Sequence, residues 1–261
     1  MKFFLTALFL ITSMKTFAFT VESGEPKFPT NEVSFDIAGN SCSNIGLSVN
    51  ELQDFAEEAV DEFWNKVSTC ALELKRGSIS TADVSSDDAT SQAGLNSLYD
   101  KAEENRILIG CNSNATLFPA NSSTLAVGTI MSGSGGMRGV VLINNTATTP
   151  FTTMSKRDKL ATIAHEIGHA FGLGHSSDPI ALMYYATGAK IQEMLSIDDF
   201  DGCSYLYPHK SPGSCGSVAI VDKDNHDLGS GNGPGQQALM AFVIGLLSIF
   251  GLNRFLVKFR Q

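Results

Sequence analysis

Residues 165–175 read His-Glu-Ile-Gly-His-Ala-Phe-Gly-Leu-Gly-His, and this run constrains the fold more than any other part of the chain. The chain has five histidines, and three of them, His165, His169 and His175, fall within the run. Side chains four residues apart on a helix lie on one face about one turn apart, so His165 and His169 can share a metal ion. We therefore predict a helix that carries two metal ligands.

The apolar spacing predicts that this helix spans residues 156–171, with Ser155 and Asp158 resembling a capping box at its start. Gly172 follows, and glycine adopts the positive φ that ends many helices at little steric cost. The chain can then reverse and bring His175 to the metal as a third ligand. Three protein ligands leave a fourth position for water, as in catalytic zinc sites.

Glu166 directly follows the first predicted ligand and is expected to act as the general base. Zinc lowers the pKa of bound water to roughly 7, so a neighbouring carboxylate can take its proton. The alternative is an amphipathic helix with ordinary histidines. We reject it because Glu166, Gly172 and His175 together match a specific zinc-protease motif.

With these residues identified, the sequence resembles the metzincin zinc proteases, and among them the matrixins. The histidine run matches their extended motif, Ser176 follows the third histidine, and Ala-Leu-Met-Tyr at 181–184 resembles their Met-turn. Residues 195–207 resemble the last helix of a matrixin. The resemblance implies an α+β, zincin-like fold, with a twisted mixed five-stranded sheet, the active-site helix, the Met-turn and a C-terminal helix.

The resemblance also implies roles for two residues after the histidines. Met183 would form the hydrophobic floor under the metal, the alternative being an ordinary core methionine. Tyr185 would assist the transition state or act as a fifth ligand, as in astacin-like and serralysin-like metzincins; the alternative is a packed aromatic at a turn. The expected cofactor is one catalytic Zn²⁺, while a structural Ca²⁺ is left open without residues that support it.

The two ends of the chain differ in composition from its middle. Residues 1–18 combine a lysine, an apolar run and small residues, which predicts a secretory signal peptide. The catalytic domain is expected at 19–208 and a linker rich in Gly and Ser at 209–237. The hydrophobic tail at 238–261 ends in basic residues and is interpreted as a membrane anchor or sorting signal, the alternative being an amphipathic or core-packing helix.

The charge of the chain argues against nucleic acid as a partner. The formal net charge is −9, and the two terminal segments hold five of the 18 basic residues and none of the 27 acidic ones. The remaining 13 basic and 27 acidic side chains give −14 for residues 19–237. Such a surface repels nucleic acid. The expected partners are protein or peptide substrates, with the membrane reached through the tail, and the protein is expected to be a monomer.

Export would allow disulfides among the five cysteines, of which at most four can pair within one chain. Two bridges and one free thiol allow fifteen arrangements. We favour Cys203 with Cys215 because they are close in the sequence. Buried free thiols are the alternative.

Alternating and apolar patterns predict the elements upstream of the histidines. The stretch 85–105, rich in Ser, Asp and Ala, is expected to be a surface excursion. The resemblance to the matrixins implies that the strand at 125–130 is the sheet edge that lines the cleft and that a peptide substrate adds to it as another strand. The predicted strands are 32–38, 71–75, 106–111, 125–130 and 139–144, with a helix at 47–67 after the first of them.

These observations together predict an exported zinc metalloendopeptidase, extracellular, periplasmic or at the cell surface, that hydrolyses proteins through zinc-activated water. Two other functions stay open. One is an adhesion or metal-binding module without turnover, for which the base Glu166 would be unnecessary. The other is a zinc hydrolase that does not act on peptides, which the Met-turn disfavours.

Overall fold

The computed structural model describes residues 19–185 and 194–209. The predicted signal peptide and hydrophobic tail lie outside these ranges, as does nearly all of the predicted linker. None of the helices within the described ranges has the length and apolar character needed to cross a bilayer.

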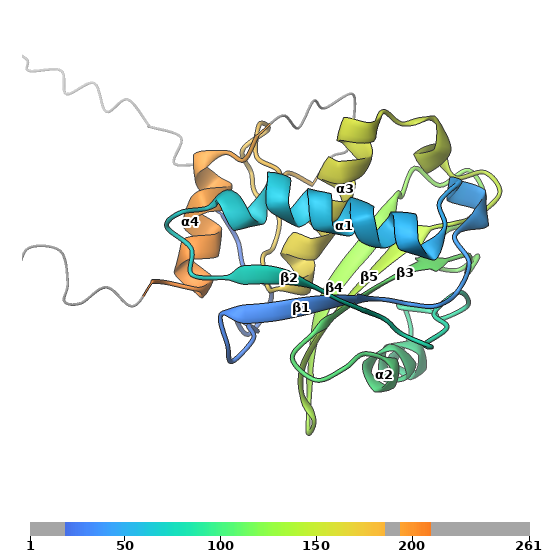
Figure 1. The fold of residues 1–261 in the computed structure, drawn as a ribbon, viewed down its shortest axis with the longest axis horizontal. Helices are drawn as coiled ribbons and strands as arrows, with labels where there is room; N and C mark the ends of the chain where they lie inside the picture. Colours follow the sequence, from blue (N-terminus) through green and yellow to red (C-terminus); the bar gives the residue numbers. More distant parts are fainter. Residues whose placement is uncertain (1–18, 186–193, 210–261) are drawn as a thin grey trace, which may run out of the picture. The chain divides into compact units, whose positions relative to one another are not determined.

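One five-stranded sheet lies at the centre of the domain (Figure 1). Its strands are β1 (Glu32–Ile37), β2 (Glu73–Ile79), β3 (Ile107–Asn112), β4 (Ala126–Gly133) and β5 (Gly136–Asn144). Across the sheet the order is β2-β1-β3-β5-β4. Strands β2, β1, β3 and β5 pair in parallel with one another, and β4 pairs antiparallel with β5 at the edge. The expected mixed five-stranded sheet is confirmed, and so is the position of its edge strand.

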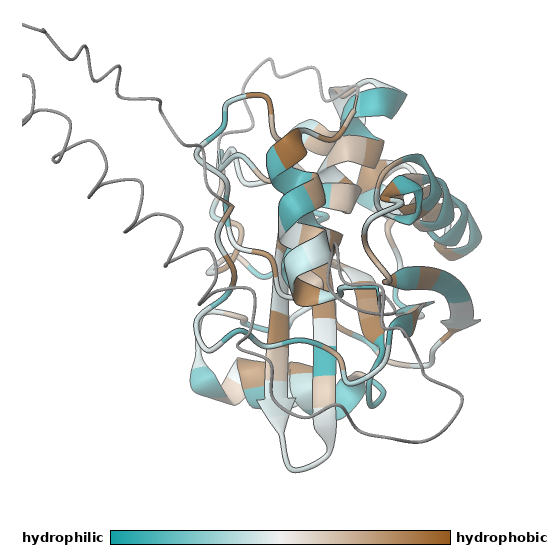
Figure 2. Cartoon of the chain, turned by 90° about the vertical axis from the view of Figure 1, so that its left-hand side faces the viewer, coloured by the Kyte–Doolittle hydropathy of each residue, from teal (hydrophilic) through white to brown (hydrophobic). Residues whose placement is uncertain are grey.

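Helices cover both faces of this sheet. On one face lie α1 (Val49–Glu62) and α3 (Lys156–Ala170), while α2 (Gln92–Lys101) lies on the other and α4 (Ile197–Leu206) closes the domain (Figure 1). Short 3₁₀ turns occur at Ser43–Ile45, Trp64–Lys66 and Pro150–Thr153. The helices carry both hydrophilic and hydrophobic residues, as expected when one side packs on a sheet (Figure 2).

The buried strands follow from their sequences. All six residues of β3 are buried, as are the last six of β5, because helices cover both sides of these central parallel strands. A capping box begins α1, where Ser48 accepts from the N–H of Glu51 and the Glu51 carboxylate accepts from the N–H of Ser48. The predicted helix at 47–67 is therefore confirmed in most of its length, with a short 3₁₀ turn at its end.

The stretch 85–105 was expected to be a surface excursion, and that prediction is wrong. It contains α2, capped by Ser91, whose side chain accepts from the N–H of Gly94. Leu98 is fully buried in a second core cluster on this face of the sheet. Leu98 is the only buried residue of this helix and Ala93 is exposed, so the pattern of period 3.6 was too weak to identify a helix.

The predicted pairing of Cys203 with Cys215 is also wrong. Cys203 of α4 is bonded to Cys70, and Cys42 to Cys111, while Cys215 lies outside the described residues. The fold brings α4 back to the segment before β2, where Ala71 donates its N–H to the carbonyl of Tyr207. Proximity in space, rather than in sequence, decides this pair.

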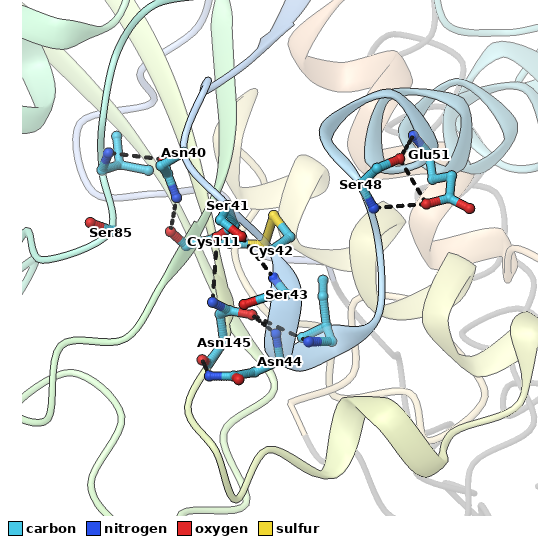
Figure 3. The surroundings of a disulfide bond; sticks show 12 residues. Asn40, Ser41, Cys42, Ser43, Asn44, Ser48, Glu51, Ser85, Cys111 and Asn145 are labelled. Carbon is cyan, nitrogen blue, oxygen red and sulfur yellow. Dashed lines mark hydrogen bonds between the residues drawn. A yellow bond between two sulfur atoms is a disulfide. The ribbon is translucent and has the colours of Figure 1, made fainter.

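The disulfide between Cys42 and Cys111 links the turn before α1 to the end of β3 (Figure 3). Around it, Oδ1 of Asn145 accepts the N–H groups of Asn44 and Ile45, and Nδ2 of Asn40 donates to the carbonyl of Cys111. This network closes the end of the sheet from which α1 begins. Both bridges are compatible with an oxidising compartment.

Candidate active site

Three imidazole rings converge at the end of α3. His165 and His169 lie on α3 and His175 on the loop that follows. Nε2 of His169 lies 3.2 Å from Nε2 of His165 and 3.2 Å from Nε2 of His175, and the nearest ring nitrogens of all three lie within 4.8 Å of one another. Tetrahedral zinc with Zn–N bonds of about 2.0–2.1 Å places two nitrogens roughly 3.3 Å apart. The spacing therefore fits one shared ion.

The hydrogen bonds of two rings determine which nitrogens can bind a metal. Nδ1 of His165 lies 2.7 Å from the carbonyl oxygen of Leu182, and Nδ1 of His169 lies 2.7 Å from that of Leu173. A carbonyl can only accept, so each Nδ1 carries the proton and each Nε2 presents a lone pair. Two lone pairs facing each other at 3.2 Å repel unless a cation lies between them. The donor chemistry of the site thus fits a metal ion.

Within residues 19–185 and 194–209, this triad is the one cluster of three or more His, Cys, Asp or Glu side chains that could hold a metal. The calcium that the sequence left open gains no support there.

The loop with the third histidine is held by the N-terminal segment of the domain. Gly172 has φ of +115°, the positive value expected where α3 ends. Thr20 accepts the N–H of Gly174 at 2.8 Å and donates its hydroxyl to the carbonyl of His175 at 2.6 Å, while Glu22 donates its N–H to Gly172 at 2.9 Å. A short antiparallel pairing therefore positions His175.

A carboxylate from the same segment approaches the second ligand. Oε1 of Glu22 lies 3.5 Å from Nδ1 of His169, and this contact lowers the pKa of Glu22. Burial alone would lower the pKa of His169, but Glu22 and Glu166 outweigh it, and the pKa is raised. Burial, together with the charge of His169, lowers the pKa of His175. The triad thus sits among carboxylates that favour a cation.

Glu166 is buried beside the first ligand, with 8% of its surface exposed. Burial raises the pKa of Glu166, although the charge of His169 and the backbone N–H of Gly128 act in the opposite direction. Gly128 of β4 lies so close to α3 that a Cβ there would come within 2.1 Å of the carbonyl oxygen of Glu166. A raised pKa makes an ionised carboxylate a stronger proton acceptor.

A cavity of about 410 Å³ opens over these side chains. One wall comes from β4 and the residues just before it, as the sequence predicted for the edge strand. Its lining consists of the three histidines, Glu22, Glu166, Tyr185 and residues 123–128. The candidate site residues therefore lie beside β4, which is the edge strand of the sheet within the described residues.

This geometry agrees with the comparison to known families. The family model described as Matrixin matches residues 61–208, which is more than half of the chain and includes all three histidines. The chain belongs to the matrixin family. The resemblance seen in the sequence is thereby confirmed.

Individual relatives match this matrixin over shorter stretches. Human matrilysin is 46% identical over 54 residues, 20% of this chain and 20% of matrilysin. Human neutrophil collagenase is 52% identical over 46 residues, 17% of this chain and 10% of its own length. Metalloendoproteinase 5-MMP of Arabidopsis thaliana is 34% identical over 101 residues, 38% of this chain and 26% of its own. The chain thus spans about a quarter or less of each of these relatives.

Among solved structures, archaemetzincin from Methanopyrus kandleri aligns with 68% of this chain and 97% of its own. The TM-score is 0.41 and the identity 14%.

The predicted Met-turn lies under the active-site helix. Met183 is buried, and a Cβ on Gly168 of α3 would come within 2.4 Å of its sulfur. Asp199 of α4 accepts the backbone N–H groups of Leu182 at 2.7 Å and Met183 at 3.0 Å. The same turn supplies the Leu182 carbonyl that orients His165. Asp199 therefore holds the turn whose Leu182 carbonyl orients His165.

Tyr185 lies beside the triad but is not packed into the core. Its side chain is 66% exposed, it lines the cavity, and its ring centroid lies 6.5 Å from that of His175. Its ring centroid also lies 4.6 Å from that of Tyr184, and its role in the reaction stays a prediction.

Sequence reasoning missed several residues that position the site. Trp64 donates its indole N–H to the carbonyl of Ala164 at 2.7 Å, one residue before the first ligand. Gly128 and Glu22 carried no local signal, because their roles depend on contacts between distant segments. Asp199 carried one: it is the last residue of a Ser-x-x-Asp capping box that begins α4.

Proposed function

We propose that this matrixin is an exported zinc metalloendopeptidase. The observation that carries the proposal is the convergence of three Nε2 atoms beside the buried carboxylate of Glu166, in a cavity that the edge strand β4 lines. His165, His169 and His175 would hold the zinc ion. When bound, the ion supplies a Lewis acid and lowers the pKa of a coordinated water to roughly 7.

Residues of the protein itself transfer the proton and orient the imidazoles. Glu166 accepts the proton of the attacking water and later passes it to the leaving amine, so one carboxylate serves first as base and then as acid. The N–H of Gly128 is hydrogen-bonded to this carboxylate and holds it at the edge of β4. The backbone carbonyls of Leu182 and Leu173 keep the two helical imidazoles in the tautomer that leaves Nε2 free.

Peptide chains are the substrates that this cavity fits. An extended peptide adds to β4 through main-chain hydrogen bonds, which gives affinity without demanding a particular sequence. This places its scissile bond beside Gly128 and Glu166, whose backbones lie in contact. Met183, buried under α3, would form the floor of the metal site.

The test compares the wild type with Glu166→Ala on a mixed peptide library, with zinc content measured on the same preparations. We expect hydrolysis to be abolished by a chelator and restored by zinc, and to fall by at least a hundredfold in Glu166→Ala with zinc still bound. Glu103→Gln, a change at an exposed acid away from the cavity, serves as the matched control. Activity that survives Glu166→Ala would refute the mechanism.

Tyr185 is proposed to assist the reaction from the rim of the cavity. Its exposed hydroxyl can donate to a carbonyl oxygen that gains negative charge as water attacks. Tyr185→Phe should lower kcat while leaving KM and zinc content close to those of the wild type. Unchanged turnover would reduce Tyr185 to a part of the cavity wall.

The proposal also includes export of the enzyme and its attachment to a membrane or surface. Residues 1–18 act as the signal peptide, and the tail at 238–261 attaches the enzyme to a membrane or sorts it to the surface. Two disulfides in the domain support an oxidising location. Cell fractionation with antibodies to the domain tests this, and intact protein in a soluble fraction with its tail attached counts against anchoring.

A further inference from the structure

Two cavities lie along β4, the edge strand of the sheet within the described residues. The first is the cavity of the histidine triad, which reaches as far as Gly128. The second, of about 510 Å³, begins at Met131 and is lined by the end of β4, the turn after it and α2. Three residues of extended chain separate Gly128 from Met131, a distance of roughly 10 Å. A single peptide strand of about eight residues can reach both cavities.

The side chains of β4 alternate between the two faces of the sheet. Ala126 and Ile130 join the core that contains α3, whereas Val127 and Met131 pack against the second core cluster. Figure 1 shows α2 and the tip of the β4–β5 hairpin on the same side of the sheet. A peptide strand added to β4 alternates in the same way. Its side chains next to Met131 on the α2 face point toward the second cavity.

Tyr99 gives this second cavity a fixed wall. Its hydroxyl accepts the N–H of Gly135 at 3.1 Å and donates to the carbonyl of Gly136 at 3.0 Å. The guanidinium of Arg138 lies 4.1 Å from the centre of its ring. An aromatic ring held from three directions is a preformed surface for an apolar side chain. Leu95 and Met131 add apolar lining beside it, and polar side chains such as Asn96 form the rim.

We infer that the cavity between α2 and the end of β4 is a distal subsite, which takes a bulky apolar side chain of a protein substrate bound along β4. The inference rests on the proposed endopeptidase function. Antiparallel pairing is the more stable per residue, so the substrate runs opposite to β4. The cavity is lined by residues 131–134, three to six residues beyond Gly128, so the distal side chain lies N-terminal to the cleaved bond by about that number of residues. The enzyme therefore acts on extended segments of proteins and recognises substrate side chains several residues away from the cleaved bond.

The test uses two peptides that share one cleavable central sequence. The short peptide has two residues before the cleaved bond, and the long peptide has eight, with leucine three to six residues before the bond. Asn96→Trp fills the second cavity, and Ala93→Trp, at an exposed position of the same helix outside the cavity lining, is the matched control. The measurement is kcat/KM for each peptide with each protein.

The wild type and Ala93→Trp should cleave the long peptide at least about tenfold more efficiently than the short one. Asn96→Trp should lose that gain and still cleave the short peptide at the wild-type rate, which also shows that it is folded. Glycine in place of the distal leucines should remove the gain in the wild type, and this measurement needs no variant.

Three results would overturn the subsite while leaving the proposed function intact: no gain from the N-terminal extension, a gain that survives Asn96→Trp, or a gain that distal glycines retain. A wild type that cleaves neither peptide would overturn the proposed function, and the subsite with it.

Discussion

Asp199 offers the sharpest test of how the fold holds the metal site. Its carboxylate accepts three backbone N–H groups, from Leu182 at 2.7 Å, Met183 at 3.0 Å and Ser196 at 2.8 Å, and its side chain is buried. In Asp199→Ala all three donors lose their acceptor. A buried donor left unsatisfied costs about 1–3 kcal/mol, and water entering the vacated space would recover part of this. We expect a net loss of about 3 kcal/mol in the free energy of unfolding.

The metal site should weaken in parallel, because the Leu182 carbonyl orients His165. Urea unfolding with and without zinc measures stability, and competition with a chelator measures zinc affinity. Asp201→Ala, at an exposed acid of the same helix, is the control and should stay within about 0.5 kcal/mol of the wild type. Burial raises the pKa of Asp199, so Asp199→Asn removes the cost of a buried charge and should lose less than the alanine variant.

If Asp199→Ala unfolds at the same urea concentration as Asp201→Ala and binds zinc as tightly, the carboxylate does not hold the turn. The geometric account of the Met-turn would then be wrong.

Three further changes test other parts of the domain. Burial would raise the pKa of Asp36, but hydrogen bonds from Arg106 and Ser78 outweigh it and lower the pKa. The contribution of Asp36 to the free energy of unfolding is therefore present above about pH 4 and is lost as the pH falls through the lowered pKa. Asp36→Asn should cost about 2 kcal/mol at pH 7 and much less near pH 2, as measured by urea unfolding at a series of pH values. Replacing Cys70 and Cys203 together by serine should cost about 2–5 kcal/mol, because the bridge closes a loop with a sequence separation of 133, and thermal unfolding without reductant measures it. Gly168→Ala would stabilise an isolated helix by about 1 kcal/mol, but here the new Cβ meets the sulfur of Met183 at 2.4 Å, so calorimetry should show a lower Tm.

The parts of the fold that the sequence predicted are those governed by local chemistry. The helix at 156–171 and the positive φ of Gly172 depend on periodicity and on the absence of a Cβ. The i, i+4 spacing of His165 and His169 brings two ligands together wherever that helix forms. These features need no knowledge of the rest of the chain.

The features that escaped prediction depend on contacts between distant segments. Cys70 and Cys203 are far apart in the sequence, and only the return of α4 joins them. The helix α2 buries a single stripe against the sheet, which leaves a weak pattern in a stretch rich in polar residues. Thr20 has no motif, and its hydrogen bond to the carbonyl of His175 is visible only once the N-terminal segment lies beside the loop.

The difference between local geometry and contacts between distant segments also explains why the histidine motif alone is not sufficient for a zinc site. Local helical geometry places two imidazoles together, but the third comes from a loop that has no regular structure of its own. That loop is fixed by the pairing with Thr20 and Glu22, and the orientation of His165 is fixed by the turn that Asp199 holds. Because these supports exist only in the folded chain, zinc binding and folding must be thermodynamically coupled. The zinc affinity of this domain therefore reports on the integrity of contacts far from the metal, and a peptide of residues 156–176 alone should bind zinc much more weakly.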